Sequence, residues 1–313
     1  MKIVMCVGNL RGLKCVEAVL TQFKQGKIEL VISTPGTSTD GISFETFCKK
    51  NSLKYFPTTN INSEEALKVV GEAEPDLLLL AGFGQILKKD ILTIPKNISI
   101  NLHGGLLPDY KGSSPLNWAI INGEKKFGVS IIEVDTGIDT GDVLEEAFFD
   151  IGENETIIDV RDKVLDIFPR LLISFLKKLE IGKFERRKHS KQDGCYYPVR
   201  KPDDGLIQWE FMTADQVHNL VRALQPPYPM AFTHFGNEKV YIVKTKKLDF
   251  SVKGIPGRVC LKRKSGIIVM CKDRALLIET VQCENGKVLP ANEKFKIGQD
   301  FRTVRALLLK EAT

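Results

Sequence analysis

The sequence predicts an α/β protein in two parts: a doubly wound parallel sheet followed by a small β-barrel. Through the first half, short apolar runs alternate with helical spacings, which is typical of a parallel sheet covered by helices on both faces. The last part instead gives short β-like runs at regular spacing, which favours a small barrel. A polar, basic segment separates the two patterns. We therefore expect one domain at 1–185, a linker at 186–203 and a second domain at 204–313.

The first domain begins with strands and helices in turn. Four apolar runs predict strands, and the continuous run 76–81 is typical of a strand buried on both faces; the runs are 2–8, 28–33, 76–81 and 98–102. Helical periodicity or start signals predict helices at 12–23, 43–51 and 63–72. Two more strands, 128–134 and 142–149, are followed by a long amphipathic helix at 156–179.

The second domain opens with one helix at 214–224, which a proline-rich stretch closes. Five short strands are then expected, separated by turns that contain glycine, asparagine and charged residues. They are 231–235, 240–244, 257–260, 267–271 and 276–281.

Composition excludes several classes of protein. No stretch of 18 apolar residues occurs, and the first apolar run lacks a small-residue cleavage site, so neither a membrane span nor a signal peptide is expected. The seven cysteines are odd in number, scattered and never spaced C-x-x-C. This argues against a disulfide framework or a zinc site and for a reducing cytoplasm.

The net charge of +6 is unevenly distributed. Residues 1–185 carry 21 Lys and Arg against 26 Asp and Glu, whereas residues 186–313 carry 24 against 13. A basic C-terminal part could bind a polyanion. It could equally be a lysine-rich solvated surface, so the charge alone does not identify a partner.

The chemically informative segment is 99–142. Asn101 and His103 lie two residues apart at the end of a predicted strand, so their side chains share one face. The carboxyl ends of strands are where open α/β sheets bind ligands. A second polar loop, 135–142, supplies carboxylates after the strand 128–134. An amide, an imidazole and a carboxylate that converge there could catalyse acyl transfer, although a lone histidine is often only structural.

This segment resembles the folate-dependent formyltransferase family. The matching motifs are Asn101-Leu-His103, Leu106-Leu-Pro108, Gly112 and Asp139-Thr-Gly141. The resemblance continues through 202–209 and 218–232, which look like the start of the family's C-terminal domain. It implies a Rossmann-like catalytic domain and a C-terminal barrel that resembles the OB-fold. It also implies that His103 is the acid/base group, that Asn101 donates to the oxyanion and that Asp139 pairs with His103.

The resemblance also implies the co-substrate, 10-formyltetrahydrofolate, with no metal. Its pterin would lie against two segments of backbone. The implied residues are Gln85, Ile86 and Leu87 in the first segment and Asp135, Thr136, Gly137 and Ile138 in the second.

Three formyl acceptors compete within the family. The short loop 33–43 contains no Lys or Arg, and phosphate contacts supply most of the affinity for nucleic acid. This favours a nucleotide-linked amino sugar, a UDP- or dTDP-linked 4-amino sugar used for surface polysaccharide or glycan biosynthesis. The basic C-terminal part keeps methionyl-tRNA formyltransferase, acting on initiator tRNA, as the alternative. Glycinamide ribonucleotide formyltransferase is a single domain, which the long C-terminal half disfavours.

Under the sugar hypothesis, the turn 8–12 would bind the diphosphate with an arginine at a helix N-terminus. The predicted substrate-binding residues are Asn9, Arg11, Ser114, Asn117 and Trp118. Arg11 could instead be a solvated cation and Trp118 a core aromatic residue. A non-catalytic binding module is less favoured because Asn101, His103 and Asp139 are all present. The sequence leaves a homodimer open.

Overall fold

The computed structural model describes residues 1–38, 40–190 and 192–301. They form two compact units, each assembled from segments that are distant in the sequence. The first unit comprises Met1–Pro115, Lys126–Phe149 and Arg161–Pro198. The second comprises Leu116–Lys125, Asp150–Val160 and the chain from Val199 onward. The domain boundaries expected from the sequence, at 185 and 203, stay a prediction.

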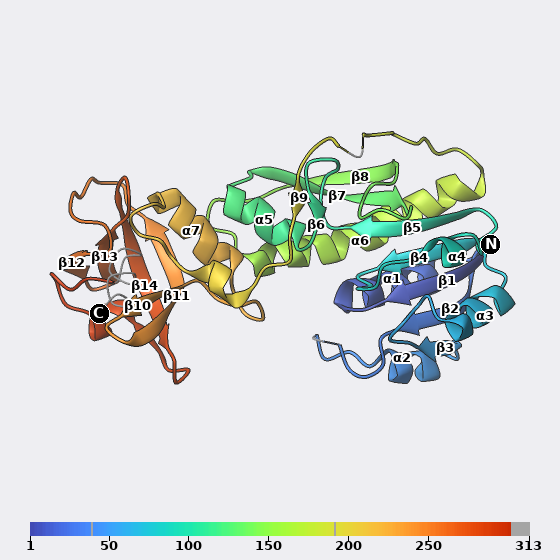
Figure 1. Ribbon diagram of the computed structural model, residues 1–313, viewed down its shortest axis with the longest axis horizontal. Coiled ribbons are helices and arrows are strands. Elements are labelled where there is room, and N and C mark those ends of the chain that lie inside the picture. The colour runs from blue at the N-terminus through green and yellow to red at the C-terminus, as the bar shows by residue number, and fades with distance from the viewer. Residues whose placement is uncertain (39, 191, 302–313) are drawn as a thin grey trace. The chain divides into compact units, whose positions relative to one another are not determined.

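The first unit is built on one seven-stranded sheet (Figure 1). Its strands are β1 (Lys2–Val7), β2 (Lys27–Ser33), β3 (Tyr55–Pro57), β4 (Leu77–Ala81), β5 (Ile98–His103), β7 (Lys126–Glu133) and β8 (Val143–Asp150). The helices are α1 (Leu10–Gln22), α2 (Phe44–Lys50), α3 (Glu64–Glu72), α4 (Lys89–Leu92) and α6 (Ile157–Glu180), which belongs to this unit from Arg161 onward. Two short strands, β6 (Lys111–Gly112) and β9 (Tyr196–Tyr197), pair with each other outside this sheet.

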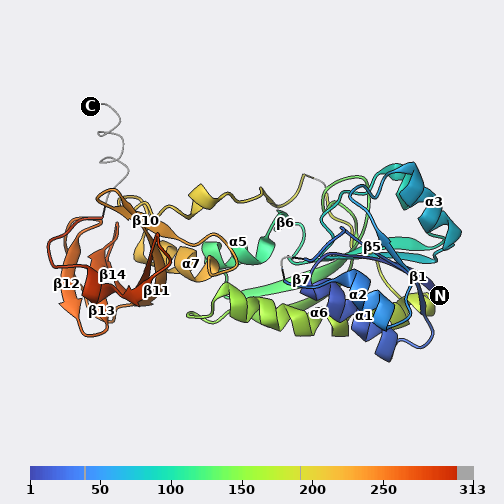
Figure 2. The ribbon, with the colours of Figure 1, turned by 90° about the horizontal axis from the view of Figure 1, so that it is seen from below.

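The strand order is β3-β2-β1-β4-β5-β7-β8. The first five strands run parallel, and β7 is antiparallel to β5. The chain therefore reverses direction beside β5, where the predicted catalytic residues lie. In Figure 2, α1 and α6 lie on one side of the sheet and α3 lies on the other. This confirms the predicted α/β architecture, with a mixed rather than purely parallel sheet.

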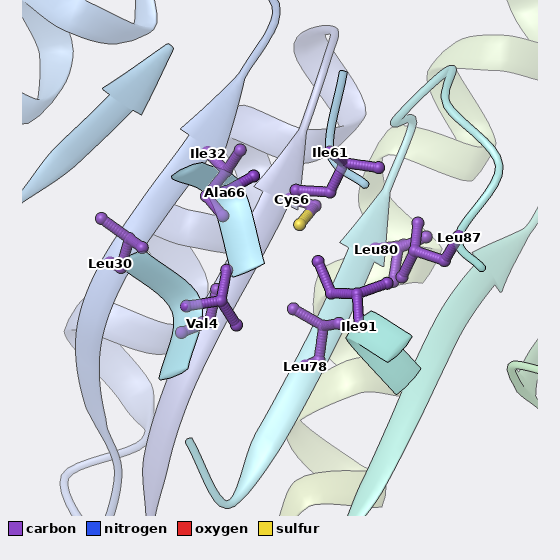
Figure 3. Close-up of a cluster of buried hydrophobic side chains, with 11 residues drawn as sticks. Val4, Cys6, Leu30, Ile32, Ile61, Ala66, Leu78, Leu80, Leu87 and Ile91 are labelled. Atoms are coloured by element: carbon purple, nitrogen blue, oxygen red, sulfur yellow. The ribbon is translucent and has the colours of Figure 1, made fainter. Parts of the chain in front are cut away.

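One face of the sheet is buried by α3 and α4 (Figure 3). Alternate residues of β1, β2 and β4 point into this layer, as the two-residue period of a strand requires. Ile61, Leu87 and Ile91 close it from the connecting segments. Each fully buried aliphatic side chain of this kind contributes about 1.5–3 kcal/mol, so the layer stabilises β1, β2 and β4 against α3 and α4. Its members are Val4, Cys6, Leu30, Ile32, Ile61, Ala66, Val70, Leu78, Leu80, Leu87 and Ile91.

Polar caps determine where the helices of the first unit begin. The Asn9 side chain accepts hydrogen bonds from the Arg11 and Gly12 N–H groups at the start of α1. Ser43 and Ser63 cap α2 and α3 in the same way. Such caps satisfy donors that have no partner within the helix, and each contributes about 1 kcal/mol. The predicted helix starts at 43 and 63 are therefore confirmed.

The second unit contains an antiparallel six-stranded sheet, with order β10-β11-β14-β13-β12 and β15 paired to β14. The strands are β10 (Phe232–Phe235), β11 (Glu238–Lys247), β12 (Val259–Arg263), β13 (Gly266–Met270), β14 (Ala275–Cys283) and β15 (Val288–Pro290). The helical elements are α5 (Pro115–Asn122), the 3₁₀ turn η1 (Pro202–Gly205), α7 (Ala214–Ala223) and α8 (Ala291–Lys294).

The predicted barrel is not confirmed. Among the described residues, no pairing joins the edge strands β10 and β12. Regular strand spacing predicts a set of short antiparallel strands, but it does not determine whether the two edges meet. The OB-like closure of this sheet therefore stays a prediction.

Within the second unit, α7 holds the loop that follows β8. The buried His218 imidazole faces the Glu153 carbonyl at 3.2 Å and the Thr245 hydroxyl at 2.9 Å. The Arg222 guanidinium donates to the carbonyls of Gly152 and Glu155. Both side chains therefore satisfy the backbone of a loop that has no strand partner. None of the helices in the described part of the chain is long and apolar enough to span a membrane.

Candidate active site

The predicted site is centred on the end of β5. Asn101 pairs with Leu80 of β4 and Ile132 of β7, and His103 pairs with Ser130 of β7. The sheet therefore holds Asn101 on both sides and His103 on the β7 side. As predicted from their spacing, Asn101 and His103 lie on one face at the carboxyl end of the strand. Asn101 is half-buried, and its side-chain amide makes no hydrogen bond within residues 1–38, 40–190 and 192–301.

The His103 imidazole is buried between two acceptors. Its Nε2 lies 2.6 Å from the carbonyl oxygen of Tyr110, and because a carbonyl oxygen only accepts, Nε2 carries the proton in this contact. Its Nδ1 lies 3.4 Å from Oδ1 of Asp139. The two side chains are 6% and 12% exposed, so water screens their interaction less than it would at the surface. The structure thus brings the predicted imidazole and carboxylate together.

The turn after β5 packs tightly around this imidazole. A Cβ on Gly105 would lie 3.0 Å from His103 Nε2 and 2.9 Å from the Tyr110 carbonyl oxygen. The Ser130 hydroxyl donates to the Gly105 carbonyl at 2.8 Å. Glycine is therefore required at position 105 by the close approach of the turn to the ring.

Asp139 reaches the site from the loop between β7 and β8. Its φ is +51°, a left-handed conformation that aspartate tolerates better than most residues. Its Oδ2 accepts a 2.9 Å hydrogen bond from the Gly112 N–H. Earlier in the loop, Asp135 Oδ1 accepts from the Gly137 N–H and the Thr140 hydroxyl. This internal turn presents Asp139 to His103.

The first predicted folate segment follows β4. The Gln85 side chain is occupied, since it donates to the Thr58 carbonyl and accepts from the Ile61 N–H. Leu87 is buried in the core, whereas Ile86 is 61% exposed. Of these three side chains only that of Ile86 is exposed, and the Ile86 carbonyl already accepts a hydrogen bond from the Asn62 amide at 2.9 Å. In the second segment, Ile138 is 43% exposed beside Thr136 and Gly137.

The predicted substrate residues are divided between the two units. Asn9 caps α1 and packs so closely on Gly82 that a Cβ there would lie 2.3 Å from its side-chain oxygen. The Arg11 guanidinium lies 5.1 Å from the Phe168 ring centroid. Ser114 has a φ of +53° and lies at the end of the turn that follows β5.

Asn117 and Trp118 belong to the second unit. The buried Asn117 amide donates to the Ala223 carbonyl at 2.9 Å, and Trp118 is half-buried. In the described part of the chain, no group of three His, Cys, Asp or Glu side chains could hold a metal ion.

Family models match both parts of the chain. A model described as formyl transferase matches residues 1–176, and a model described as formyl transferase, C-terminal domain matches residues 200–298. The chain belongs to the formyltransferase family. The resemblance seen in the sequence motifs is thereby confirmed.

Named relatives cover most of this formyltransferase. The methionyl-tRNA formyltransferase of Acetivibrio thermocellus is 34% identical over 79% of this chain and 79% of its own length. That of Clostridium botulinum is 38% identical over 77% of this chain and 79% of its own.

Solved structures share the fold at lower identity. An N-formyltransferase from Helicobacter canadensis, in complex with folinic acid and dTDP-3-aminofucose, is 18% identical, with a TM-score of 0.68 over 89% of this chain and 99% of that one. A variant of HypX from Aquifex aeolicus is 17% identical, with a TM-score of 0.61 over 94% of this chain. The formyltransferase spans about half of HypX, 48% of that chain.

The predicted amino-sugar acceptor is wrong. The relatives at 33–38% identity are named methionyl-tRNA formyltransferase, whereas the sugar N-formyltransferases are only 18–22% identical. The prediction relied on the absence of Lys and Arg from loop 33–43, and under that hypothesis the turn 8–12 was expected to bind the diphosphate. A loop without Lys or Arg excludes only that loop as a source of cationic phosphate contacts, not the rest of the surface.

The donors at the start of α1 are already used. The Arg11 and Gly12 N–H groups donate to Asn9, and the Leu10 N–H donates to Asp40 at 3.0 Å. Arg161 pairs with the same carboxylate at 3.6 Å. A carboxylate from loop 33–43 thus occupies the position where the sequence suggested a bound diphosphate.

Sequence reasoning gave no role to the neighbours that surround the pair of His103 and Asp139, although Gly112 belongs to the matched motif. Tyr110 contacts His103 through its backbone carbonyl, and Gly112 contacts Asp139 through its N–H. Backbone groups leave no side-chain signature, so only the positions in the turn could have pointed to them. A third residue, Tyr197, stacks on Tyr110 at a centroid distance of 4.9 Å, and it lies in the segment predicted as a linker.

Proposed function

We propose that this formyltransferase transfers the formyl group of 10-formyltetrahydrofolate to the α-amino group of methionine on initiator tRNA. The observation that carries the proposal is the set of relatives named methionyl-tRNA formyltransferase, which are 33–38% identical over 77–81% of the chain. The C-terminal part of this chain is basic, with 24 Lys and Arg against 13 Asp and Glu after residue 185. Such a surface suits a polyanionic acceptor.

In the proposed reaction, the neutral amine attacks the formyl carbon and the carbonyl oxygen becomes an oxyanion. The Asn101 amide, which is not engaged elsewhere in the described residues, would donate to this oxygen. When the tetrahedral intermediate collapses, the bond from carbon to N10 of the folate breaks. The proton lost by the amine ends on N10, so formylmethionyl-tRNA and tetrahydrofolate are released. His103 would carry that proton while Asp139 holds its ring.

The folate would lie against residues 85–87 and 135–138. Gln85 and Leu87 are occupied within the fold, which supports recognition of the pterin edge by backbone groups. The exposed Ile86 and Ile138 offer apolar surface to the ring. The structural neighbour from Helicobacter canadensis was solved with folinic acid. Asn9, Arg11, Ser114, Asn117 and Trp118 stay predicted contacts on the acceptor side.

We infer a reducing, cytoplasmic setting for this reaction. All seven cysteines are free, as is usual where thiols are kept reduced. Burial raises the pKa of the Cys15 thiol to about 12, so it stays protonated and unreactive. We expect the second unit, with or without OB-like closure, to contribute to holding the tRNA.

The test is a direct assay of acceptors. The full-length protein would be incubated with 10-formyltetrahydrofolate and either methionyl initiator tRNA or a nucleotide-linked 4-amino sugar. We expect formylmethionyl-tRNA, detected after deacylation, together with stoichiometric tetrahydrofolate. His103→Ala should remove this activity and leave the circular dichroism spectrum unchanged. Formylation of the sugar with none of the tRNA would overturn the proposal.

A further inference from the structure

Residues 186–190 and 192–198, from the segment predicted as a linker, belong to the first unit. We call them the strap. They lie against the two catalytic loops, which are the turn after His103 and the loop that contains Asp139. Near Asp139, Arg187 and Val143 exchange two backbone hydrogen bonds of 2.8 and 3.0 Å. The Arg187 guanidinium donates to the Leu107 carbonyl at 3.3 Å, and His189 Nε2 contacts the Gly141 carbonyl at 3.0 Å. The strap thus joins the end of the Asp139 loop to the turn after His103.

The other end of the strap pairs with that same turn. Strands β6 and β9 lie side by side and parallel (Figure 1). The Lys111 N–H donates to the Cys195 carbonyl at 3.0 Å, and the Ser113 N–H donates to the Tyr197 carbonyl at 2.9 Å. The Lys111 side chain is buried and donates to the Asp193 carbonyl at 2.6 Å. Three successive contacts therefore fix the turn against the strap.

One contact leads directly to the imidazole. The ring of Tyr197 stacks on the buried ring of Tyr110, with 4.9 Å between centroids and 11° between planes. Phe127 meets Tyr110 edge-on at 4.7 Å on another side. The backbone carbonyl of this clamped tyrosine is the atom that lies 2.6 Å from His103 Nε2. Removing the stacked ring would free the carbonyl that orients His103.

A second contact leads to the carboxylate. Gly112 donates to Asp139 Oδ2, and its φ is +95°. A Cβ on Gly112 would lie 2.3 Å from the Tyr197 carbonyl oxygen. The strap therefore approaches too closely for any side chain, and it leaves the Gly112 N–H little freedom to move away from Asp139.

We propose that the strap sets the relative position of His103 and Asp139, with Tyr197 as the positioning residue that acts through Tyr110. This inference rests on the proposed function, because it assigns the two side chains to catalysis. Misplacing a reacting group by about 1 Å can cost 100-fold in rate. The strap touches the catalytic loops, so its loss should change turnover more than substrate binding.

The kinetic test compares Tyr197→Ala with Tyr197→Phe, which keeps the stacked ring. Cys195→Ala is the matched control, because its side chain is exposed and its backbone contact remains. For Tyr197→Ala we expect kcat to fall about 10- to 100-fold, with both KM values within about two-fold of wild type. Tyr197→Phe and Cys195→Ala should stay close to wild type. A wild-type kcat in Tyr197→Ala, or an equal loss in Tyr197→Phe, would overturn the inference.

A spectroscopic test is independent of the acceptor. The chain has four histidines, so the His103 ring can be assigned in ¹⁵N-histidine-labelled full-length protein by its loss in His103→Ala. Its ring ¹⁵N shifts should change in Tyr197→Ala and hold in Tyr197→Phe. If Tyr197→Ala does not fold, Tyr197→Leu keeps the bulk without the planar stack and should give the same change. An unchanged His103 resonance in Tyr197→Ala would refute the inference that the strap positions His103. Absence of formyl transfer in the wild type would refute only the proposed function.

Discussion

At the scale of single residues, Asp139 is held by its backbone as well as by its charge. Its φ of +51° is in the left-handed region, and its carboxylate joins the Gly112 N–H to His103. Strained residues of this kind persist where the surrounding structure over-determines them, and they cluster at active sites. The two carboxylate oxygens divide the work: Oδ2 fixes the side chain and Oδ1 faces the ring.

Asp139→Asn separates these two effects. Asparagine tolerates the same backbone, and its amide oxygen can accept from Gly112, but it removes the negative charge beside His103. We expect kcat to fall by about 10²- to 10⁴-fold with little change in KM or thermal stability. Steady-state kinetics would measure kcat and KM, and thermal unfolding would measure the stability. The exposed Asp109, in the turn after β5, provides the control, because Asp109→Asn should retain activity. An Asp139→Asn enzyme with normal kcat would exclude Asp139 from the mechanism.

At the scale of elements, α7 carries a buried imidazole that is sensitive to acid. Burial lowers the pKa of His218 below 6.5, and the neighbouring Arg222 and Lys247 cations add to this. Its neutral form suits the contacts in place, with Nε2 donating to the Glu153 carbonyl and Nδ1 accepting from the Thr245 hydroxyl. The unfolded chain therefore binds a proton more readily than the native unit does.

From this difference in proton uptake, stability should fall as the pH drops. The contribution of His218 is fully present above the unfolded pKa near 6.5, and it is lost as the pH falls toward the lower folded value. We expect the free energy of unfolding to decline from pH 7.5 to 5.5, by at most about 1.4 kcal/mol per pH unit from this group. His218→Gln, which can make the same two hydrogen bonds, should decline less in urea unfolding. A slope equal to wild type in that variant would exclude His218 as the cause.

At the scale of elements, local sequence patterns determine which features of the fold and the site could be predicted. The period of a strand places Asn101 and His103 on one face, and strand polarity places them at the ligand-binding edge, so both were found from local pattern. The cap residues Ser43 and Ser63 also act locally. The contact between Tyr110 and Tyr197 is long-range, and it reaches His103 through a backbone carbonyl. No local pattern encodes a long-range contact or a contact made through a backbone carbonyl. The closure of the second sheet likewise depends on strand edges that are distant in the sequence.

At the scale of the whole molecule, charge is the property that the sequence made hardest to interpret. The basic run after residue 185 suggested a surface for phosphates, but part of it is neutralised within the fold. Arg186 pairs with Glu133 at 2.7 Å and Arg187 with Glu146 at 2.8 Å. These arginines hold the strap to the first unit. Better candidates for phosphate contacts are cations that are exposed and lack such partners among the described residues. The β12–β13 hairpin offers two of them, Lys262 and Lys264.

The salt dependence of tRNA binding tests this distinction. Each phosphate contact releases counterions, so the logarithm of the binding constant falls with the logarithm of salt concentration by about 1 per contact. We expect the double variant Lys262→Ala/Lys264→Ala to bind initiator tRNA more weakly, with a slope shallower by about 1–2. The charge-matched control is Lys2→Ala/Lys68→Ala, since those lysines pair with Glu74 and Glu72 in the first unit. Filter binding between about 50 and 200 mM salt spans a range in which such slopes are measurable. Equal slopes in both double variants would mean that the hairpin makes no phosphate contact, and the tRNA would then have to be held by cations elsewhere on the chain.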